Sequence, residues 1–186
     1  MSPHGSEAPS DWVKRWSHLV RAGGTVLDVA CGRGRHARWF HERKHRLTLV
    51  DREQAAIDSI AISPASCEKV VADIENGPWP FAGRSFDAVV VTNYLWRPLM
   101  PDLLESLAPG GVLIYETFTQ GNETVGKPSR PDFLLRPGEL LQVCAGLRIV
   151  GFEDGFLDAP PRFVQRIAAV RASVPAAGAP VLPLPR

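Results

Sequence analysis

The sequence predicts an α/β fold: a doubly wound, mostly parallel seven-stranded sheet with helices on both faces and an antiparallel final strand. Short apolar runs, of the kind that form fully buried strands, alternate with stretches whose apolar residues recur at helical spacing. This alternation is typical of parallel βαβ units. The last two apolar runs are instead joined through a short turn at 158–161, which favours an antiparallel closing pair.

The length allows one domain. With 186 residues, of which 45% are hydrophobic, the chain can bury one well-packed core and is too short for two ordinary domains. We expect a cap helix within residues 1–24, the α/β domain at 25–172, and a proline-rich, disordered tail at 173–186. A single domain must therefore carry the function.

The elements can be placed in order along the chain. Trp12, Trp16 and the apolar residues after them lie at helical spacing, which predicts a leading helix that Gly23 and Gly24 end. Strands are expected at 25–30, 47–50, 69–72, 86–92, 112–116, 148–152 and 163–170. Helices are expected at 35–43, 55–62, 101–107 and 138–144, with a turn at 109–111. The long polar segment at 117–136 has the length of a functional or mobile loop.

Composition excludes several classes of function. The formal net charge is only +1, so no strong overall field attracts nucleic acid or an anionic membrane. Cys31, Cys67 and Cys144 are odd in number and form no CxxC pair, which argues against a disulfide framework or a zinc knuckle. The sequence contains no secretory signal pattern and no apolar run that could span a bilayer. We therefore expect a soluble, cytoplasmic protein with a small-molecule partner.

Polar residues gather where the predicted strands end. In open α/β sheets, ligands bind outside the carboxyl ends of the strands. These ends carry residues 28–34, Asp51, Asp73, Asn93 and Glu116.

The glycine turn after the first strand is compatible with two cofactors. Gly32, Gly34 and Ala37 satisfy the G-x-G-x-x-G/A fingerprint of dinucleotide sites, in which a helix N-terminus holds a pyrophosphate. That match alone is weak. Asp28 lies four residues before Gly32, and its carboxylate suits a cationic amino group better than a pyrophosphate.

This set of residues resembles the class I, Rossmann-like methyltransferases that depend on S-adenosylmethionine (AdoMet). The first motif of that family has the form D-x-x-x-G-x-G, and the resemblance continues through Asp51, residues 72–74, residues 86–87 and residues 107–111. More narrowly, the chain is similar to small bacterial methyltransferases of the tellurite-resistance type. The matching segments are VLDVACGRGRHAR, TNYLWRPL, LIYETFTQGNETVGKP and FLLRPGEL. The resemblance implies AdoMet as cofactor and S-adenosylhomocysteine as product.

The resemblance also implies roles for particular residues. Asp28 would hold the methionine amino group, directly or through water, and Asp51 would accept hydrogen bonds from both ribose hydroxyls. Asp73 would bind the adenine amino group, Ile74 would pack on the ring, and Asn93 would lie near the methionine portion. The expected cofactor-binding residues are Asp28, Ala30, Gly32, Gly34, Arg35, Asp51, Arg52, Asp73, Ile74 and Asn93. The alternatives are a helix cap or solvated strand end for the aspartates, and core packing for Ile74.

Three arginines crowd a site that is expected to hold a sulfonium cation. We expect Arg35 or Arg33 to face the methionine carboxylate, while Arg38 faces solvent. The alternative is that these are solvated arginines at a helix start.

Two other features invite a chemical interpretation that we do not favour. The stretch from His41 to His45 reads H-E-x-x-H, the zinc metalloprotease signature. It lies where the first helix of the domain must end and is flanked by charge, so we expect a solvated helix end and no metal site. Cys31 is expected to be a small interior residue rather than a nucleophile.

The motifs say less about the residues that bind or activate the methyl acceptor. Methyl transfer from a sulfonium has a neutral leaving group, so positioning and desolvation can suffice without a base. Candidate catalytic residues are Tyr94, Glu116 and Arg97, with packing or a helix start as the alternative uses. Glu123 is a further candidate base, and Arg130 with Arg97 could hold an anionic substrate.

A small-molecule methyl acceptor is therefore expected, with no membrane and no nucleic acid partner. The alternatives are an RNA or protein-end acceptor, a non-catalytic AdoMet-binding module, and an NAD(P)-dependent oxidoreductase, which would normally show a Tyr-x-x-x-Lys pair that this sequence lacks. The leading helix and the 117–136 loop could close together as a lid; otherwise both tryptophans belong to the permanent core and the loop is surface.

Overall fold

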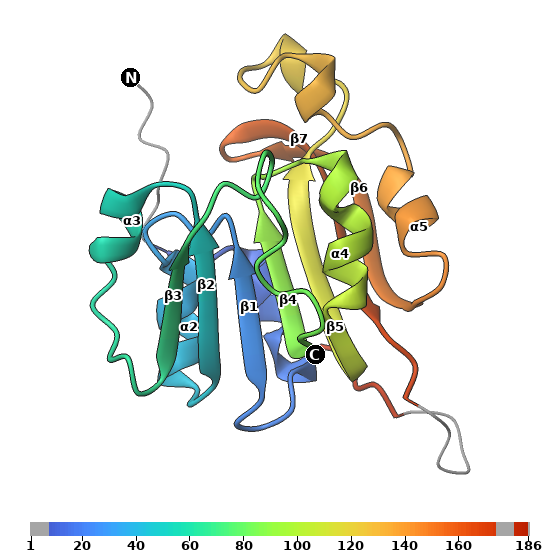
Figure 1. The fold of residues 1–186 in the computed structure, drawn as a ribbon. Coiled ribbons are helices and arrows are strands. Elements are labelled where there is room, and N and C mark those ends of the chain that lie inside the picture. The colour runs from blue at the N-terminus through green and yellow to red at the C-terminus, as the bar shows by residue number, and fades with distance from the viewer. Residues whose placement is uncertain (1–7, 174–180, 186) are drawn as a thin grey trace.

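The computed structural model describes residues 8–173 and 181–185. One seven-stranded sheet runs in the order β3-β2-β1-β4-β5-β7-β6 (Figure 1). The strands β1 to β5 pair in parallel, and β7 pairs antiparallel with both β5 and β6. The predicted fold class is confirmed, including the antiparallel closing strand. The strands are β1 Thr25–Val29, β2 Arg46–Asp51, β3 Cys67–Val71, β4 Phe86–Thr92, β5 Leu107–Phe118, β6 Arg148–Asp158 and β7 Pro161–Val170.

Helices cover both faces of this sheet. In Figure 1, α4 lies on the near face and α2 on the far face. The α-helices are α1 Asp11–Trp16, α2 Arg35–Glu42, α3 Gln54–Asp58, α4 Met100–Glu105 and α5 Glu139–Val143. Short 3₁₀ helices are η1 Ser17–Leu19, η2 Arg97–Leu99, η3 Asn122–Thr124 and η4 Pro131–Phe133.

The strand order reverses beside β1, which pairs in parallel with β2 on one side and with β4 on the other. The chain after β1 therefore leaves towards one half of the sheet, and the chain after β4 towards the other. Such a switch point opens a crevice at the carboxyl ends of the strands. The predicted cofactor residues lie at the carboxyl ends of β1 and β2, at the start of α2 and in the loops after β1, β2, β3 and β4.

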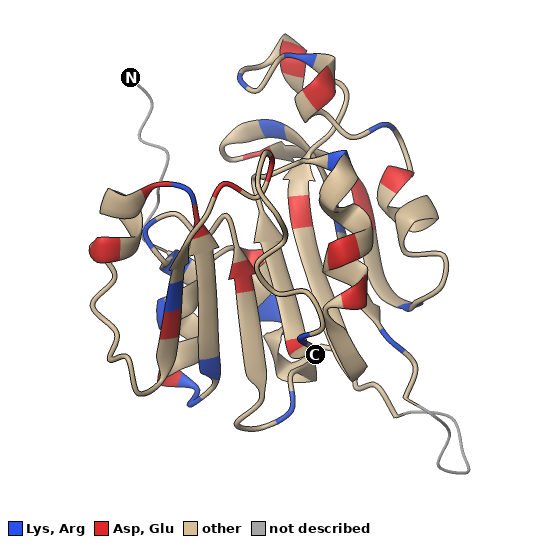
Figure 2. Ribbon diagram, viewed as in Figure 1, with Lys and Arg blue, Asp and Glu red and all other residues tan. Residues whose placement is uncertain are grey.

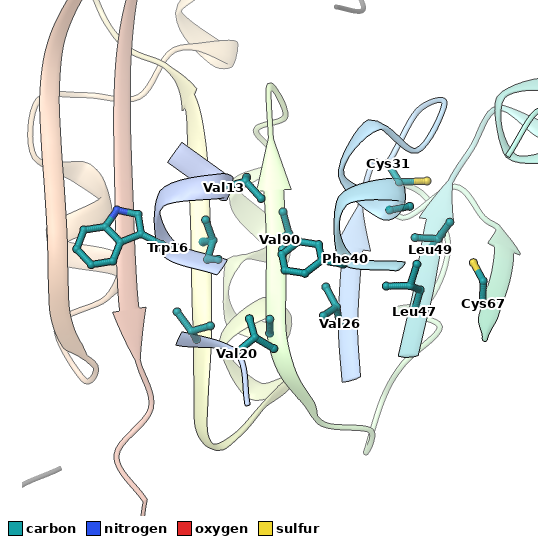
Figure 3. Packing of buried hydrophobic residues seen from close by; sticks show 14 of the residues in the cluster. Val13, Trp16, Val20, Val26, Cys31, Phe40, Leu47, Leu49, Cys67 and Val90 are labelled. Carbon is teal, nitrogen blue, oxygen red and sulfur yellow. The ribbon is translucent and has the colours of Figure 1, made fainter. Parts of the chain in front are cut away.

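Two apolar clusters hold the layers together. On one face, Phe40 of α2 packs with strand residues that include Val26 and Val90 (Figure 3). On the other face, Leu103 of α4 and Leu140 of α5 join the second cluster. Burial of both faces explains why the strands are nearly continuous apolar runs rather than alternating ones.

The leading helix is part of the core. Trp12 and Trp16 are each only 2% exposed, and the Trp12 indole Nε1 donates to the carbonyl of Ile167 in β7 at 3.1 Å. A Cβ at Gly151 in β6 would overlap the Trp16 ring, so glycine makes room for that indole. Ser10 caps the helix by accepting from the Trp12 amide at 3.1 Å.

Two predicted elements differ from the structure. The turn expected at 109–111 lies inside β5 as an irregularity: Leu107 pairs with Phe86, and Val112 already pairs with Ala88. The helix expected at 55–62 ends at Asp58. Ile60 remains buried without being helical, so spacing alone extended the predicted helix too far.

The predicted tail falls partly outside the described residues, since 174–180 and 186 are not described. Residues 181–185 contain no helix or strand. Leu182 nevertheless packs against the first apolar cluster, so this part of the tail contacts the domain.

Candidate cofactor and acceptor site

The turn after β1 brings backbone close to the switch point. Ala30, Gly32 and Gly34 have φ values of 52°, 53° and 71°, in the left-handed region. The Cys31 amide donates to the Val50 carbonyl of β2 at 3.1 Å, which fixes the turn against its neighbour. A Cβ at Gly34 would lie 2.9 Å from Ile60 Cδ1, so this position requires glycine for both its conformation and its contact.

Asp51 at the end of β2 is tied to that turn. Its Oδ2 accepts from the Gly32 amide at 2.8 Å, and its Oδ1 accepts from the Glu53 amide at 2.9 Å. The carboxylate is thus held in place by two backbone donors at the rim of the crevice.

Asp28 presents a buried carboxylate. The residue is 2% exposed, and its Oδ2 is buried without a hydrogen-bond partner among the described residues. Burial raises the pKa of this carboxyl to about 7, against the lowering effect of the Arg35 cation and with a further increase from Asp51. A cationic group placed here would restore the ionised form.

The three arginines separate as follows. Arg35 is half-buried and donates to Thr92 Oγ1 at 3.3 Å, with Glu116 and Asp28 as its electrostatic neighbours. Arg33 and Arg38 are exposed. Arg35 is therefore the arginine directed towards the strand ends.

A small cavity of about 170 Å³ lies over the ends of β2 and β3. It is lined by Ala30, Asp51, Arg52, Ala72, Asp73, Ile74, Glu75 and Tyr94. The Asp73 carboxylate already accepts from the Glu75 amide at 3.0 Å and from the Asn76 side-chain amide at 2.9 Å. These hydrogen bonds, that of Asn76 first, lower the pKa of Asp73. Figure 2 shows acidic positions at the ends of β1 and β5 and in the loops after β2 and β3.

A larger cavity of about 330 Å³ adjoins the first. It is lined by Glu75, Asn93, Tyr94, Leu95, Thr117, Phe118, Lys127, Pro128 and Phe133. Asn93 has a φ of 55° and donates its amide to the Glu116 carbonyl at 2.9 Å. Glu75 and Tyr94 line both cavities and so mark their junction.

A hydrogen bond to its backbone carbonyl holds Tyr94 at this junction. The Tyr115 hydroxyl donates to the Tyr94 carbonyl at 2.8 Å. Burial, followed by the neighbouring Glu75 carboxylate, raises the pKa of the Tyr94 phenol. Tyr94 is therefore a neutral donor at ordinary pH.

Glu116 is buried within a polar network that joins the leading segment to the sheet. Its Oε1 accepts from Ser10 Oγ at 2.9 Å and its Oε2 accepts from Arg166 Nη1 at 3.1 Å. The Ser10 amide donates to His36 Nε2 at 3.2 Å. Burial, then the Arg35 cation, lowers the pKa of His36 to about 3, so the ring is neutral. Both Glu116 oxygens thus have partners inside the protein.

The predicted catalytic Arg97 is engaged in packing the late loop. It donates to both Glu139 carboxylate oxygens, at 2.7 and 2.9 Å, and to the carbonyls of Asp132 and Leu134. Arg130 pairs with the Asp132 carboxylate at 3.1 Å on the surface. Glu123 accepts from the Gly121 amide at 2.8 Å. None of these three side chains lines the larger cavity.

The H-E-x-x-H stretch does not lie on one helix. The helix α2 ends at Glu42, and Lys44 adopts a left-handed φ of 64°. Within the described residues, no group of three or more His, Cys, Asp or Glu side chains could hold a metal ion. All three cysteines are free and buried, and burial raises the pKa of the Cys31 thiol. The described part of the chain has no helix long and apolar enough to cross a bilayer.

Sequence reasoning missed several residues of the larger cavity. Thr117, Phe118, Lys127 and Phe133 lie in or next to a segment read only as a polar loop. The family resemblance covered these positions and the length of the loop indicated a function, but neither assigned these residues to a cavity.

The crevice fits AdoMet on its own geometry. Asp28 offers an unpartnered buried carboxylate to a cationic amino group, and Asp51 and Ile74 line one cavity. This fold with acidic residues at this edge is the arrangement expected of a class I, Rossmann-like methyltransferase.

Comparisons with known proteins agree. The family described as "Methyltransferase domain" matches residues 26–111. The malonyl-[acyl-carrier protein] O-methyltransferase of Serratia marcescens is 31% identical over 106 residues, covering 54% of this chain and 40% of that protein. The corresponding protein of Salmonella typhimurium is also 31% identical, over 108 residues, 55% of this chain and 42% of that protein. The chain thus spans well under half the length of these curated relatives.

Solved structures show the same fold. TehB from Haemophilus influenzae superposes with a TM-score of 0.71 at 17% identity, covering 91% of this chain and 64% of that one. A SAM-dependent methyltransferase from Mesorhizobium loti gives 0.66 at 18% identity, covering 84% and 97%. The chain thus has the fold of class I methyltransferases, and its match to a methyltransferase domain over residues 26–111 supports AdoMet as the cofactor.

Proposed function

We propose that this protein transfers a methyl group from AdoMet to a small-molecule acceptor. The observation that carries the proposal is the pair of adjoining cavities. One lies over the acidic ends of β2 and β3, the other opens beside it, and Glu75 and Tyr94 belong to both. A donor in the first and an acceptor in the second would meet at these two residues.

The cofactor residues would act by holding and orienting. Asp28 would receive the methionine amino group, and Arg35, which donates to Thr92, would face the methionine carboxylate. Asp51 would accept from the ribose hydroxyls, and Ile74 would cover the adenine ring. The roles of Ala30, Gly32, Gly34, Arg52, Asp73 and Asn93 stay proposals of the same kind.

The acceptor residues would act mainly by positioning. When bound, AdoMet supplies an electrophilic methyl group on a sulfonium, so the leaving group is neutral. Tyr94 would donate a hydrogen bond at the junction, since the raised pKa of its phenol makes it a poor base at neutral pH. Glu116 would orient Ser10 and Arg166, which bond to its two oxygens, and it lines neither cavity.

A nicotinamide dinucleotide fits this crevice less well. A pyrophosphate at the glycine turn would lie beside the carboxylates of Asp28 and Asp51. The Gly32 amide, which such a site would use, already donates to Asp51. An oxidoreductase is therefore the weaker proposal.

The alternatives to a small-molecule acceptor are other classes of acceptor and binding of AdoMet without catalysis, and the experiment described below distinguishes them. By their names, the curated relatives act on a malonyl group attached to a carrier protein; a carrier-bound acceptor is thus an alternative, as is an RNA or protein end. A cytoplasmic, bacterial setting is proposed with them, in keeping with free cysteines and bacterial relatives.

The test has two stages. Calorimetry should show binding of AdoMet or S-adenosylhomocysteine at micromolar strength or better, with NAD and NADP silent. Methyl-labelled AdoMet would then be incubated with the protein and separate metabolite, RNA and protein fractions. Label in the metabolite fraction supports the proposal. Label only in RNA or protein, binding without transfer, or tight NAD binding would each overturn it.

A further inference from the structure

Lys127 is the basic side chain in the lining of the larger cavity. It lies in the segment between β5 and α5, on the side of the cavity formed by Pro128 and Phe133. Glu75 lines the same cavity but also lines the cofactor cavity. The negative charge of Glu75 therefore faces the junction, and the positive charge of Lys127 belongs to the acceptor side alone.

Lys127 differs from the neighbouring arginines because no carboxylate of a described residue pairs with it. Arg97 and Arg136 both pair with Glu139, and Arg130 pairs with Asp132. Lys127 forms no ion pair with any described residue. A cation that borders a cavity without a protein partner is free to pair with a ligand.

The position of Lys127 is set by the fold of the loop. Buried Asn122 donates to the Pro128 carbonyl at 3.0 Å and accepts from the Phe163 amide at 3.1 Å. These two bonds tie the residue after Lys127 to β7. Thr119 and Leu135 close the base of the loop with a parallel bridge.

The remaining walls are largely apolar. Leu95, Phe118, Pro128 and Phe133 contribute four apolar side chains to the lining. A cavity of roughly 150 Å³ can hold benzene. The volume of about 330 Å³ therefore has room for an aromatic or similarly flat apolar body with one substituent.

We propose that the acceptor is an organic anion, a small carboxylate with a flat apolar body, whose charged group pairs with Lys127 while its reactive atom points towards Tyr94. This inference rests on the proposed function, because it names the substrate class of the same site. The methyl group would form its new bond to the acceptor heteroatom as its bond to sulfur breaks, and a proton on that atom would leave to water.

The probes are trans-cinnamate and its neutral amide, cinnamamide, each titrated by calorimetry into protein saturated with S-adenosylhomocysteine. Cinnamate should bind about fivefold or more tightly than cinnamamide at low salt, and the preference should shrink as salt is added. Lys127→Gln should remove the preference and leave cinnamamide binding unchanged. The matched control is Arg46→Gln, which removes one positive charge at an exposed position at the start of β2 that does not line the cavity.

The inference would be overturned by equal binding of the two probes, by a preference that survives Lys127→Gln, or by no binding of either probe at millimolar concentration. Tighter binding of cinnamylamine would also overturn it and would assign the recognition to Glu75. The saturation step is measured first. If S-adenosylhomocysteine does not bind, that result counts against the proposed function. The preference for cinnamate over cinnamamide is then measured with the protein alone, and it tests the inference about Lys127 separately.

Discussion

Among single residues, Asp28 has opposite effects on stability and on binding. Its carboxyl pKa is about 7 in the ligand-free fold, against 3.8 as the ordinary value. Between these pH values the folded protein retains a proton that the unfolded chain has lost. The contribution of Asp28 to the free energy of unfolding therefore falls as pH rises from about 4 to about 7 and stays low above that.

Asp28→Asn should raise the melting temperature relative to the native protein by an amount that grows over that pH range. The same variant should bind S-adenosylhomocysteine about tenfold or more weakly at pH 8, because a charge-assisted hydrogen bond is lost. Native affinity should rise with pH up to about 7, and the variant should lack that rise. Melting curves and calorimetric titrations check both, with exposed Asp58→Asn as the control. A variant that binds as well as the native protein would remove Asp28 from the site.

Asp51 allows a second test at this scale. Asp51→Ala should weaken S-adenosylhomocysteine binding by roughly two orders of magnitude or more, since two charge-assisted hydrogen bonds to ribose would be lost. The fold should survive, because the Gly32 and Glu53 amides that now reach Asp51 can turn to water at this half-exposed position. Calorimetry and thermal melting separate the two effects. Unchanged affinity with a collapsed melting temperature would make Asp51 a structural cap.

Among the elements, Arg97 joins η2 to the late loop and α5. The Glu139 side chain is 6% exposed, and although burial alone would raise its pKa, the hydrogen bonds from Arg97 lower it. Arg97→Gln should therefore lower the free energy of unfolding by about 2 kcal/mol. Because the depressed pKa of Glu139 contributes stability above its ordinary value of 4.5, the difference between variant and native protein should shrink as pH falls below it.

Denaturant unfolding at pH 7 and at pH 4 measures this difference. Arg130→Gln breaks an exposed pair and should change stability by less than about 0.5 kcal/mol. If Arg97→Gln removes methyl transfer while leaving stability and pH dependence unchanged, Arg97 contacts substrate, as its sequence position first indicated.

The sequence predicted the elements better than their ends. Periodicity identified all seven strands. The central strands are buried on both faces and so are apolar throughout, whereas the more exposed edge strands β3 and β6 were indicated by shorter apolar runs. It misjudged the 55–62 helix, because Ile60 is buried by its contact with Gly34 rather than by a helical face. The irregularity in β5 was equally invisible: residues 109–111 are typical of a turn, and hydrogen bonds of Gly110 and Gly111 with Arg171 hold them beside the end of β7.

In the candidate site, residues that are close together along the chain could be predicted from sequence spacing, and residues brought together from distant parts of the chain could not. Asp28, Gly32 and Gly34 lie within one turn, so their spacing along the chain carries the geometry. Lys127 reaches the acceptor cavity only because Asn122 fixes the loop on β7, a contact between residues 41 positions apart. No local pattern encodes such a contact, so spacing along the chain could propose residues for the cofactor half of the site but could not propose Lys127 for the acceptor half.

At the scale of the whole molecule, the remaining question is which parts move when ligand binds. The sequence suggested that α1 and the 117–136 loop close together. Trp12 and Trp16 are buried, and Trp12 is hydrogen-bonded to β7, so α1 belongs to the core. Ser10 further ties its start to Glu116. The outer part of the loop differs, because Val125 and Phe133 are 43% and 41% exposed.

We therefore expect ligand-dependent protection in the loop but not in the helix. Hydrogen exchange should show residues 11–20 protected to the same extent with and without S-adenosylhomocysteine, because opening them would expose two core tryptophans. Residues 123–133 should exchange quickly alone and slow when S-adenosylhomocysteine and cinnamate are both present, since Lys127 and Phe133 gain a contact only with the acceptor. Added protection in residues 11–20 would instead restore the two-part lid. Unchanged exchange in residues 123–133 would mean an open acceptor cavity, which suits a bulky acceptor on RNA or protein better than a small carboxylate.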